Sequence, residues 1–269
     1  MLTNPLSTGR QMRAPLSLRQ EYEEFIAERI EDYKDQLSRP ELLAIADEAV
    51  KELDAGPESQ LVLTEVLMLD HVDRLIRRRL KLPPFRRWRQ RHVQLRHAQR
   101  TLTHWGLPGR TPLADLAQRI EPDDRALVVG CAAAPAAYFL AAHGADVLVI
   151  DESLPAVESV ETRAAAEALA TRVQAMLVRL GHWFPEIRPA LVVIHPGTLG
   201  TIDAPSRLKL TETLLERTVR GGVHLVLPME SPPHVRALAP EALQSQYKNW
   251  IVERGPRRGT SRWLLATKP

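Results

Sequence analysis

The chain has 269 residues, 44% of them hydrophobic and 26% charged, which is ordinary for a globular protein with an ample core. Its single cysteine, Cys131, excludes an internal disulfide, and no apolar run approaches the length of a transmembrane helix. The formal net charge is only +3. Because the first residues lack the apolar core of a signal peptide, we expect a cytoplasmic protein.

The N-terminal part of the chain has a helical pattern. Residues 1–16 are rich in Pro, Ser, Thr and Gly and predict a flexible tail. Residues 17–104 then show apolar positions at a helical period and predict a helical region. Two helix starts have the pattern of a capping box, at Ser17-Gln20 and at Ser38-Glu41. A third amphipathic helix is expected to end near Leu80, which is enough for a small bundle.

Charge is distributed unevenly within this helical region. Residues 21–54 are rich in acids, whereas residues 74–100 contain eleven lysines and arginines and no acid. The eleven cations are Arg74, Arg77, Arg78, Arg79, Lys81, Arg86, Arg87, Arg89, Arg91, Arg96 and Arg100. A basic helix is expected from about residue 85 to 104, after a bend at Pro83-Pro84.

The basic stretch has three interpretations. Its arginines, with Phe85 and Trp88 between them, fit RNA or DNA phosphates and stacked bases. Alternatively the arginines dock against the acidic helices, either in this chain or in a protein partner or second copy. The third interpretation is an exposed, solvated face.

Residues 105–269 alternate short apolar runs with helical segments and predict a second domain with an α/β fold. Strands are expected near residues 126–130, 147–151, 173–178, 190–194 and 223–228, mainly in one parallel sheet. An amphipathic helix at 206–220 ends at Gly221-Gly222. Two last strands, between about 249 and 267, predict an antiparallel hairpin.

The main candidate site lies at the ends of the first two of these strands. Gly130 ends the first strand, and the small residues Ala132 and Ala134 leave room for a ligand near the backbone of the following turn. Asp151 ends the second strand, and an acid there can accept hydrogen bonds from both hydroxyls of a ribose. We therefore expect a nucleoside-containing cofactor. The alternative is a turn that keeps its shape without a ligand, with Asp151 capping the next helix.

The same stretch resembles the first motif of class I S-adenosylmethionine-dependent methyltransferases. That motif has an acid near the end of strand one, then G-x-G-x-G, then an acid that ends strand two. Gly130 matches the first glycine and Asp151 the ribose-binding acid. Val128, Ala132 and Ala134 stand where the family has the first acid and the other two glycines.

The resemblance covers roughly residues 111–269 and includes the order helix, Gly-Gly, strand and the closing hairpin. It implies a Rossmann-like class I methyltransferase sheet, and S-adenosylmethionine as the cofactor. Gly130, Ala132, Ala134 and Asp151 would then be the cofactor-binding residues. The spacing is most similar to small-molecule methyltransferases of the thiopurine and tellurite-resistance type.

Further residues of the site follow from the same resemblance. His195 follows the fourth strand, where methyltransferases place substrate-facing or catalytic residues, and histidine can act as a general base. Its alternative is an ordinary loop histidine. Near Arg179, where the family often has an acid that contacts the adenine, this chain has none. The spacing of His182, His224 and His234 predicts no metal site.

Two functions are therefore expected from the sequence. The first is an S-adenosylmethionine-dependent methyltransferase that acts on an unidentified substrate of the small-molecule class. The second is a non-catalytic relative, a pseudoenzyme whose sheet is a scaffold and whose helices bind a protein or RNA partner.

Overall fold

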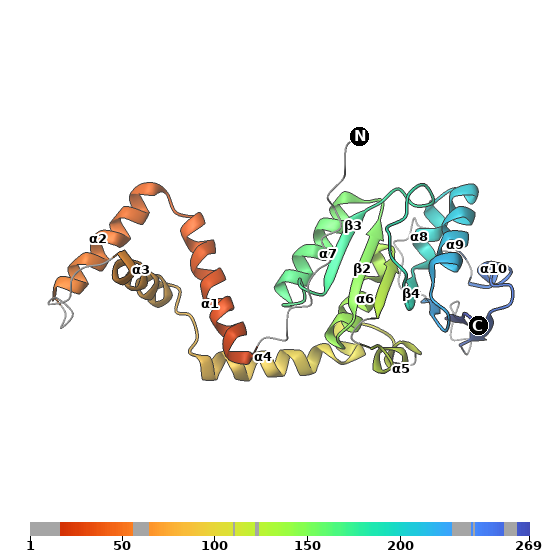
Figure 1. Ribbon diagram of the computed structural model, residues 1–269, viewed down its shortest axis with the longest axis horizontal. Helices are drawn as coiled ribbons and strands as arrows, with labels where there is room; N and C mark the ends of the chain where they lie inside the picture. Colours follow the sequence, from red (N-terminus) through yellow and green to blue (C-terminus); the bar gives the residue numbers. More distant parts are fainter. Residues whose placement is uncertain are drawn as a thin grey trace. The chain divides into compact units, whose positions relative to one another are not determined.

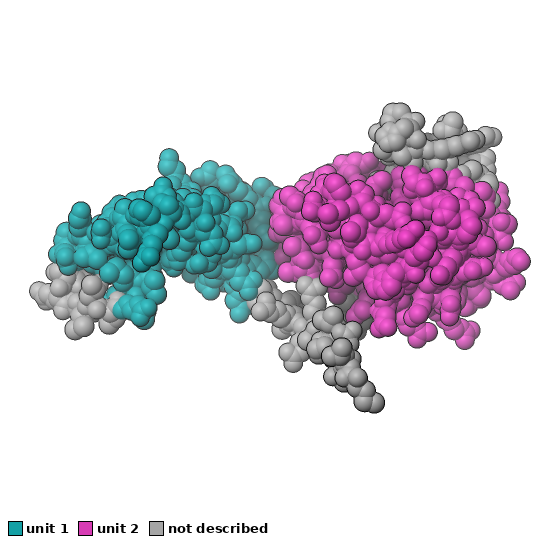
Figure 2. All heavy atoms as spheres, turned by 90° about the horizontal axis from the view of Figure 1, so that it is seen from above, with its two compact units in different colours: residues 1–94 teal, residues 95–269 magenta. Residues whose placement is uncertain are grey.

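The structure is a computed structural model that describes residues 17–55, 65–109, 111–121, 124–227, 238, 240–255 and 263–269. It contains two compact units, residues 1–94 and 95–269, which are coloured separately in Figure 2. The expected tail at 1–16, His234 and the turn of the C-terminal hairpin lie outside the described residues. None of the helices in the described ranges is both long and apolar enough to cross a membrane.

The first unit contains three helices that bury one small apolar core, α1 (Leu18–Asp35), α2 (Arg39–Ala55) and α3 (Glu65–Arg79). The expected capping box begins α1, because Ser17 Oγ accepts from the Gln20 backbone and the Gln20 side chain accepts from the Ser17 backbone. The buried residues of the core shared by these three helices are Ile30, Ile45, Ala49, Leu75 and Ile76. Helix α4 (Phe85–Gln99) follows α3 and is the basic helix expected from the sequence.

The second unit is built on a seven-stranded sheet in the order β3-β2-β1-β4-β5-β7-β6 (Figure 1). The strands are β1 (Arg125–Val129), β2 (Asp146–Asp151), β3 (Val173–Leu177), β4 (Leu191–Ile194), β5 (Val223–Val226), β6 (Ile251–Arg254) and β7 (Leu264–Thr267). The first five strands pair in parallel, and β7 is antiparallel to both β5 and β6. The α/β fold and the closing antiparallel strands expected from the sequence are confirmed.

Successive residues of the central strand β1 contribute to two different cores. Ala126 and Val128 pack with residues of α5 (Leu113–Gln118), α6 (Ala134–Ala142) and α7 (Leu154–Ala166). Leu127 and Val129 pack with residues of α8 (Pro196–Thr201), α9 (Ala204–Arg217) and α10 (Pro240–Gln244). Helices thus cover both faces, which explains why the strands are continuous apolar runs.

Some expected helix boundaries were wrong. Helix α4 ends at Gln99 rather than 104, and a separate 3-10 turn, η2 (Leu102–Trp105), follows it. The reason is Trp105, whose buried indole packs beside Tyr138 and donates to the Gln99 carbonyl at 2.7 Å. Neither α8 nor the short turn η3 (Cys131–Ala133) was expected.

A fully buried polar network on β5 links the sheet to α9 and to the segment after α10. The Thr218 hydroxyl donates to the Leu214 carbonyl at 2.7 Å, so it accepts from His224 Nε2, also at 2.7 Å. His224 Nδ1 then accepts from the Tyr247 hydroxyl at 3.2 Å. Burial, and secondarily the nearby Lys268 ammonium group, lower the pKa of His224 to about 3. The ring is therefore neutral at physiological pH.

The low pKa of His224 predicts that the free energy of unfolding falls as the pH drops below about 6.5. The reason is that His224 becomes protonated in the unfolded chain but stays neutral in the folded protein. Between pH 6.5 and 5.0, His224 should lower the unfolding free energy by about 1.6 kcal/mol, because the slope is about half of 1.4 kcal/mol per pH unit at the unfolded pKa and approaches the full value below it. Urea unfolding of the wild type and of His224→Gln at both pH values measures the difference. Equal pH dependence in the two proteins would contradict the prediction.

Candidate functional site

Three of the expected site residues lie together at the carboxyl edge of the sheet. Gly130 follows β1, Asp151 ends β2 and His195 follows β4. Strand β1 lies between β2 and β4, so the direction of the crossovers reverses there. The backbone N–H groups of Gly130 and His195 continue the strand pairing, donating to the carbonyls of Ile150 and Val129. Such a switch point is where open α/β sheets bind ligands.

The carboxylate of Asp151 bridges the turn after β1 and the start of α7. Its Oδ2 accepts from the backbone N–H of Cys131 at 2.6 Å, and its Oδ1 accepts from that of Ser153 at 2.9 Å. Each carboxylate oxygen has two acceptor sites. The Cys131 thiol also hydrogen-bonds this carboxylate, so three of the four sites are used and one is left for a further donor. Asp151 therefore positions the turn and still has capacity for one hydroxyl group.

Gly130 has a conformation and a contact that only glycine allows. Its φ is +96°, and a Cβ added there would lie 2.0 Å from Oγ1 and 2.8 Å from Cβ of Thr198 in α8. The space over the glycine is thus filled by a side chain of the same protein. Of the two alanines in the turn, Ala132 is exposed, whereas Ala134 is buried in the core at the start of α6.

His195 lies where the sequence places it, but its side chain is turned into the protein. It is 1% exposed and forms the N-cap of α8, where its Nδ1 accepts from the backbone N–H of Thr198 at 3.2 Å. That contact holds Thr198 over Gly130. The catalytic role of His195 stays a prediction.

Two residues of this edge had not been singled out from the sequence. Thr198 is one of them. Glu152 is the other, since its Oε1 accepts from the backbone N–H of Leu180 at 2.9 Å. Glu152 thereby brings a carboxylate to the segment after β3. That segment has no acid of its own near the exposed Arg179. Its position directly after Asp151 was the available signal, whereas nothing in the sequence distinguished Thr198.

The thiol of Cys131 is kept protonated by its surroundings. Burial, followed by the charge of Asp151 and a hydrogen bond to it, raises the pKa of Cys131 to about 12. A nucleophilic cysteine needs the opposite shift. Among the described residues, no group of three or more His, Cys, Asp or Glu side chains is arranged to hold a metal ion.

We predict that Gly130→Ala lowers the free energy of unfolding by about 2–3 kcal/mol, because the new side chain is strained and overlaps Thr198. Gly144→Ala is the matched control, since Gly144 has a φ of +107° and nothing within 4 Å of an added Cβ. Urea unfolding of both variants measures the difference. A cost no greater at Gly130 than at Gly144 would show that Thr198 does not fill this space.

We predict that Cys131 reacts with iodoacetamide at pH 8 at least about 100-fold more slowly than free cysteine, because at a pKa of about 12 almost none of it is thiolate. Asp151→Asn should speed the reaction, and urea should restore the ordinary rate. Mass spectrometry follows the modification of this single cysteine. A rate within tenfold of that of free cysteine would contradict the prediction.

The chain is similar to many solved structures, three of which are described here. The first is the glycopeptide N-methyltransferase MtfA in complex with S-adenosylmethionine, with 17% identity, a TM-score of 0.46, and coverage of 58% of this chain and 92% of that one. The N-methyltransferase NodS from Bradyrhizobium japonicum has 16% identity, a TM-score of 0.45 and coverage of 67% and 96%. TehB from Haemophilus influenzae has 17% identity, a TM-score of 0.45 and coverage of 58% and 61%.

No protein-family model and no curated protein sequence matches the chain. At these identities the similarity to solved structures concerns the fold alone. The strand order, with β7 antiparallel to its neighbours, is that of a class I methyltransferase-like fold.

Proposed function

We propose that this protein is an S-adenosylmethionine-dependent methyltransferase whose cofactor site is the edge formed by Gly130, Asp151 and Thr198. The observation that supports this most directly is the Asp151 carboxylate, which lies at the switch point of the sheet with one acceptor site left beside its bonds to Cys131 and Ser153. That site can accept from a ribose hydroxyl. A cytoplasmic location and a small-molecule substrate belong to the same proposal.

Different residues at this edge would hold the two ends of the cofactor. Asp151 would hold the ribose, and Glu152 places a second carboxylate beside the segment after β3, on the adenine side. The turn from Gly130 to Ala134 would hold the methionine end, where Ala132 is small and exposed. Thr198 lies over Gly130, so the methionine end must pass beside its hydroxyl. When bound, S-adenosylmethionine supplies an electrophilic methyl group on its sulfonium.

The chemistry asked of the protein is mainly positioning. Methyl transfer needs a nucleophile in line with the sulfonium, and orientation by itself can lower such a barrier greatly. His195 acts here through Thr198, which it holds with its Nδ1. The Thr198 hydroxyl and the exposed turn at Ala132 are therefore the groups that we expect to face the reacting atoms.

We predict that the wild type binds S-adenosylmethionine and that Asp151→Ala weakens binding by about 1–3 kcal/mol, the usual cost of losing hydrogen bonds to a charged group. Isothermal titration calorimetry with S-adenosylmethionine and S-adenosylhomocysteine measures both affinities. Asp146→Ala is the matched control, because Asp146 starts the same strand, is exposed and pairs only with Arg172 among the described residues.

Circular dichroism of each variant is needed beside the titrations, because Asp151 also holds the backbone of Cys131 and Ser153. Equal losses in Asp146→Ala and Asp151→Ala would remove Asp151 from the site. If the folded wild type bound neither compound, the methyltransferase proposal would fail.

A second candidate, the non-catalytic scaffold, is supported by one specific observation. The glycine that would admit a ligand is covered by Thr198, and Val128, Ala132 and Ala134 replace the polar and glycine positions of the motif. Under this proposal the bridge between Asp151 and Cys131 only stabilises the turn. The same calorimetry distinguishes the two candidates, since a scaffold has no affinity for either compound.

A further inference from the structure

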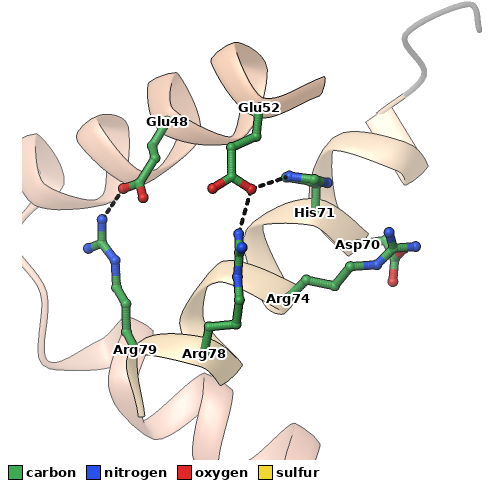
Figure 3. Close-up of polar contacts among 7 residues, drawn as sticks. All are labelled: Glu48, Glu52, Asp70, His71, Arg74, Arg78 and Arg79. Carbon is green, nitrogen blue, oxygen red and sulfur yellow. Dashed lines mark hydrogen bonds and ion pairs between the residues drawn. The ribbon is translucent and has the colours of Figure 1, made fainter. Parts of the chain in front are cut away.

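The basic stretch of the sequence divides into two parts with different surroundings. On α3, Arg78 pairs with Glu52 and Arg79 with Glu48, both on α2 (Figure 3). Arg77 donates to the hydroxyl of Tyr22, and Arg74 pairs with Asp70 within α3. The arginines of α3 are therefore engaged by groups of their own unit.

Four arginines of α4 have different surroundings. Arg86, Arg87, Arg89 and Arg91 are exposed, and none of the four forms an ion pair or a hydrogen bond with another residue that the structure describes. The sequence has no acid between Asp73 and Asp115, so none is contributed by α4 itself. We call these four arginines the α4 basic face.

The aromatic residues of α4 fix the helix and are not available to a ligand. Trp88 is only 8% exposed and packs between Tyr22 of α1, at 5.4 Å between ring centroids, and His92, at 4.5 Å. Phe85 packs edge to face on Tyr22, and the Arg19 guanidinium lies over its ring. The idea that Phe85 and Trp88 stack on bases is therefore wrong for Trp88 and unsupported for Phe85. Any nucleic acid would be bound through its phosphates.

We propose that the α4 basic face binds the phosphate backbone of a nucleic acid duplex, independently of the methyltransferase proposal. Guanidinium groups suit phosphates, to which they donate two parallel hydrogen bonds. Surfaces that bind proteins or membranes usually expose several apolar side chains. On α4, Val93 is the one large apolar side chain that is strongly exposed. A face with four cations and little apolar surface fits a polyanion. Without exposed stacking rings it fits paired bases better than a single strand.

Fluorescence anisotropy with a labelled 20-base-pair RNA duplex tests the proposal, with a DNA duplex of the same sequence as a second arm. Four phosphate contacts predict a slope of about −3.6 for log affinity against log salt, which is about a 150-fold loss between 50 and 200 mM salt. The variant Arg86→Gln/Arg87→Gln/Arg89→Gln leaves one contact, and its slope should fall to about −1.

A matched control removes the same charge elsewhere. Lys209→Gln/Arg217→Gln/Arg220→Gln changes three exposed cations on and after α9 and should leave affinity and slope unchanged. Thermal melts check folding, and if the α4 triple variant unfolds, Arg91→Gln replaces it with an expected slope change of about 1.

Any one of the following results would overturn the proposal. They are no anisotropy change at 50 mM salt, an equal loss in the α9 control, and equal competition by polyglutamate, which would assign the face to an acidic protein segment instead. Tight binding to single-stranded but not to duplex RNA would also contradict it. Calorimetry with S-adenosylmethionine is unaffected by any of these outcomes, so the two proposals can fail separately.

Discussion

The candidate site depends on the hydrogen bond between the Asp151 carboxylate and the backbone N–H of Cys131. This contact, at 2.6 Å, joins the end of β2 to the turn that follows β1. It fixes the turn in which Gly130 takes its positive φ, and the same charge helps to keep the Cys131 thiol protonated. The Asp151 side chain is already held in one geometry, so a ligand that bound at this edge would not pay the entropic cost of ordering it.

A related constraint acts in the helical unit, where the positions of acids decide which cations remain available. Glu48 and Glu52 of α2 face α3 and occupy its arginines, because the two helices pack along the Ile45, Ala49 and Ile76 core. Helix α4 is held instead through Trp88, on its apolar side. Arg86, Arg87, Arg89 and Arg91 are exposed there, and leaving an exposed charge unpaired costs much less free energy than leaving a buried charge unpaired.

The sequence by itself predicted the α/β fold and the place of most strands. Apolar runs such as Ala126–Val129 fill strands that are covered on both faces, and the shortness of each run favours a strand over a buried helix. It also placed Gly130, Asp151 and His195 at strand ends, which parallel pairing then brings to one edge. The helix end at 104 was misjudged, because Trp105 turns into the core there.

Only the tertiary structure decided what these residues touch. The contact of Thr198 with Gly130 joins elements 68 positions apart, and no periodicity or motif encodes such a distance. The burial of His195, the network around His224 and the split of the basic stretch depend in the same way on packing between elements. Local sequence sets backbone preference and amphipathic pattern. Which side chain fills a given space is set by residues that are distant in the chain and neighbours only after folding.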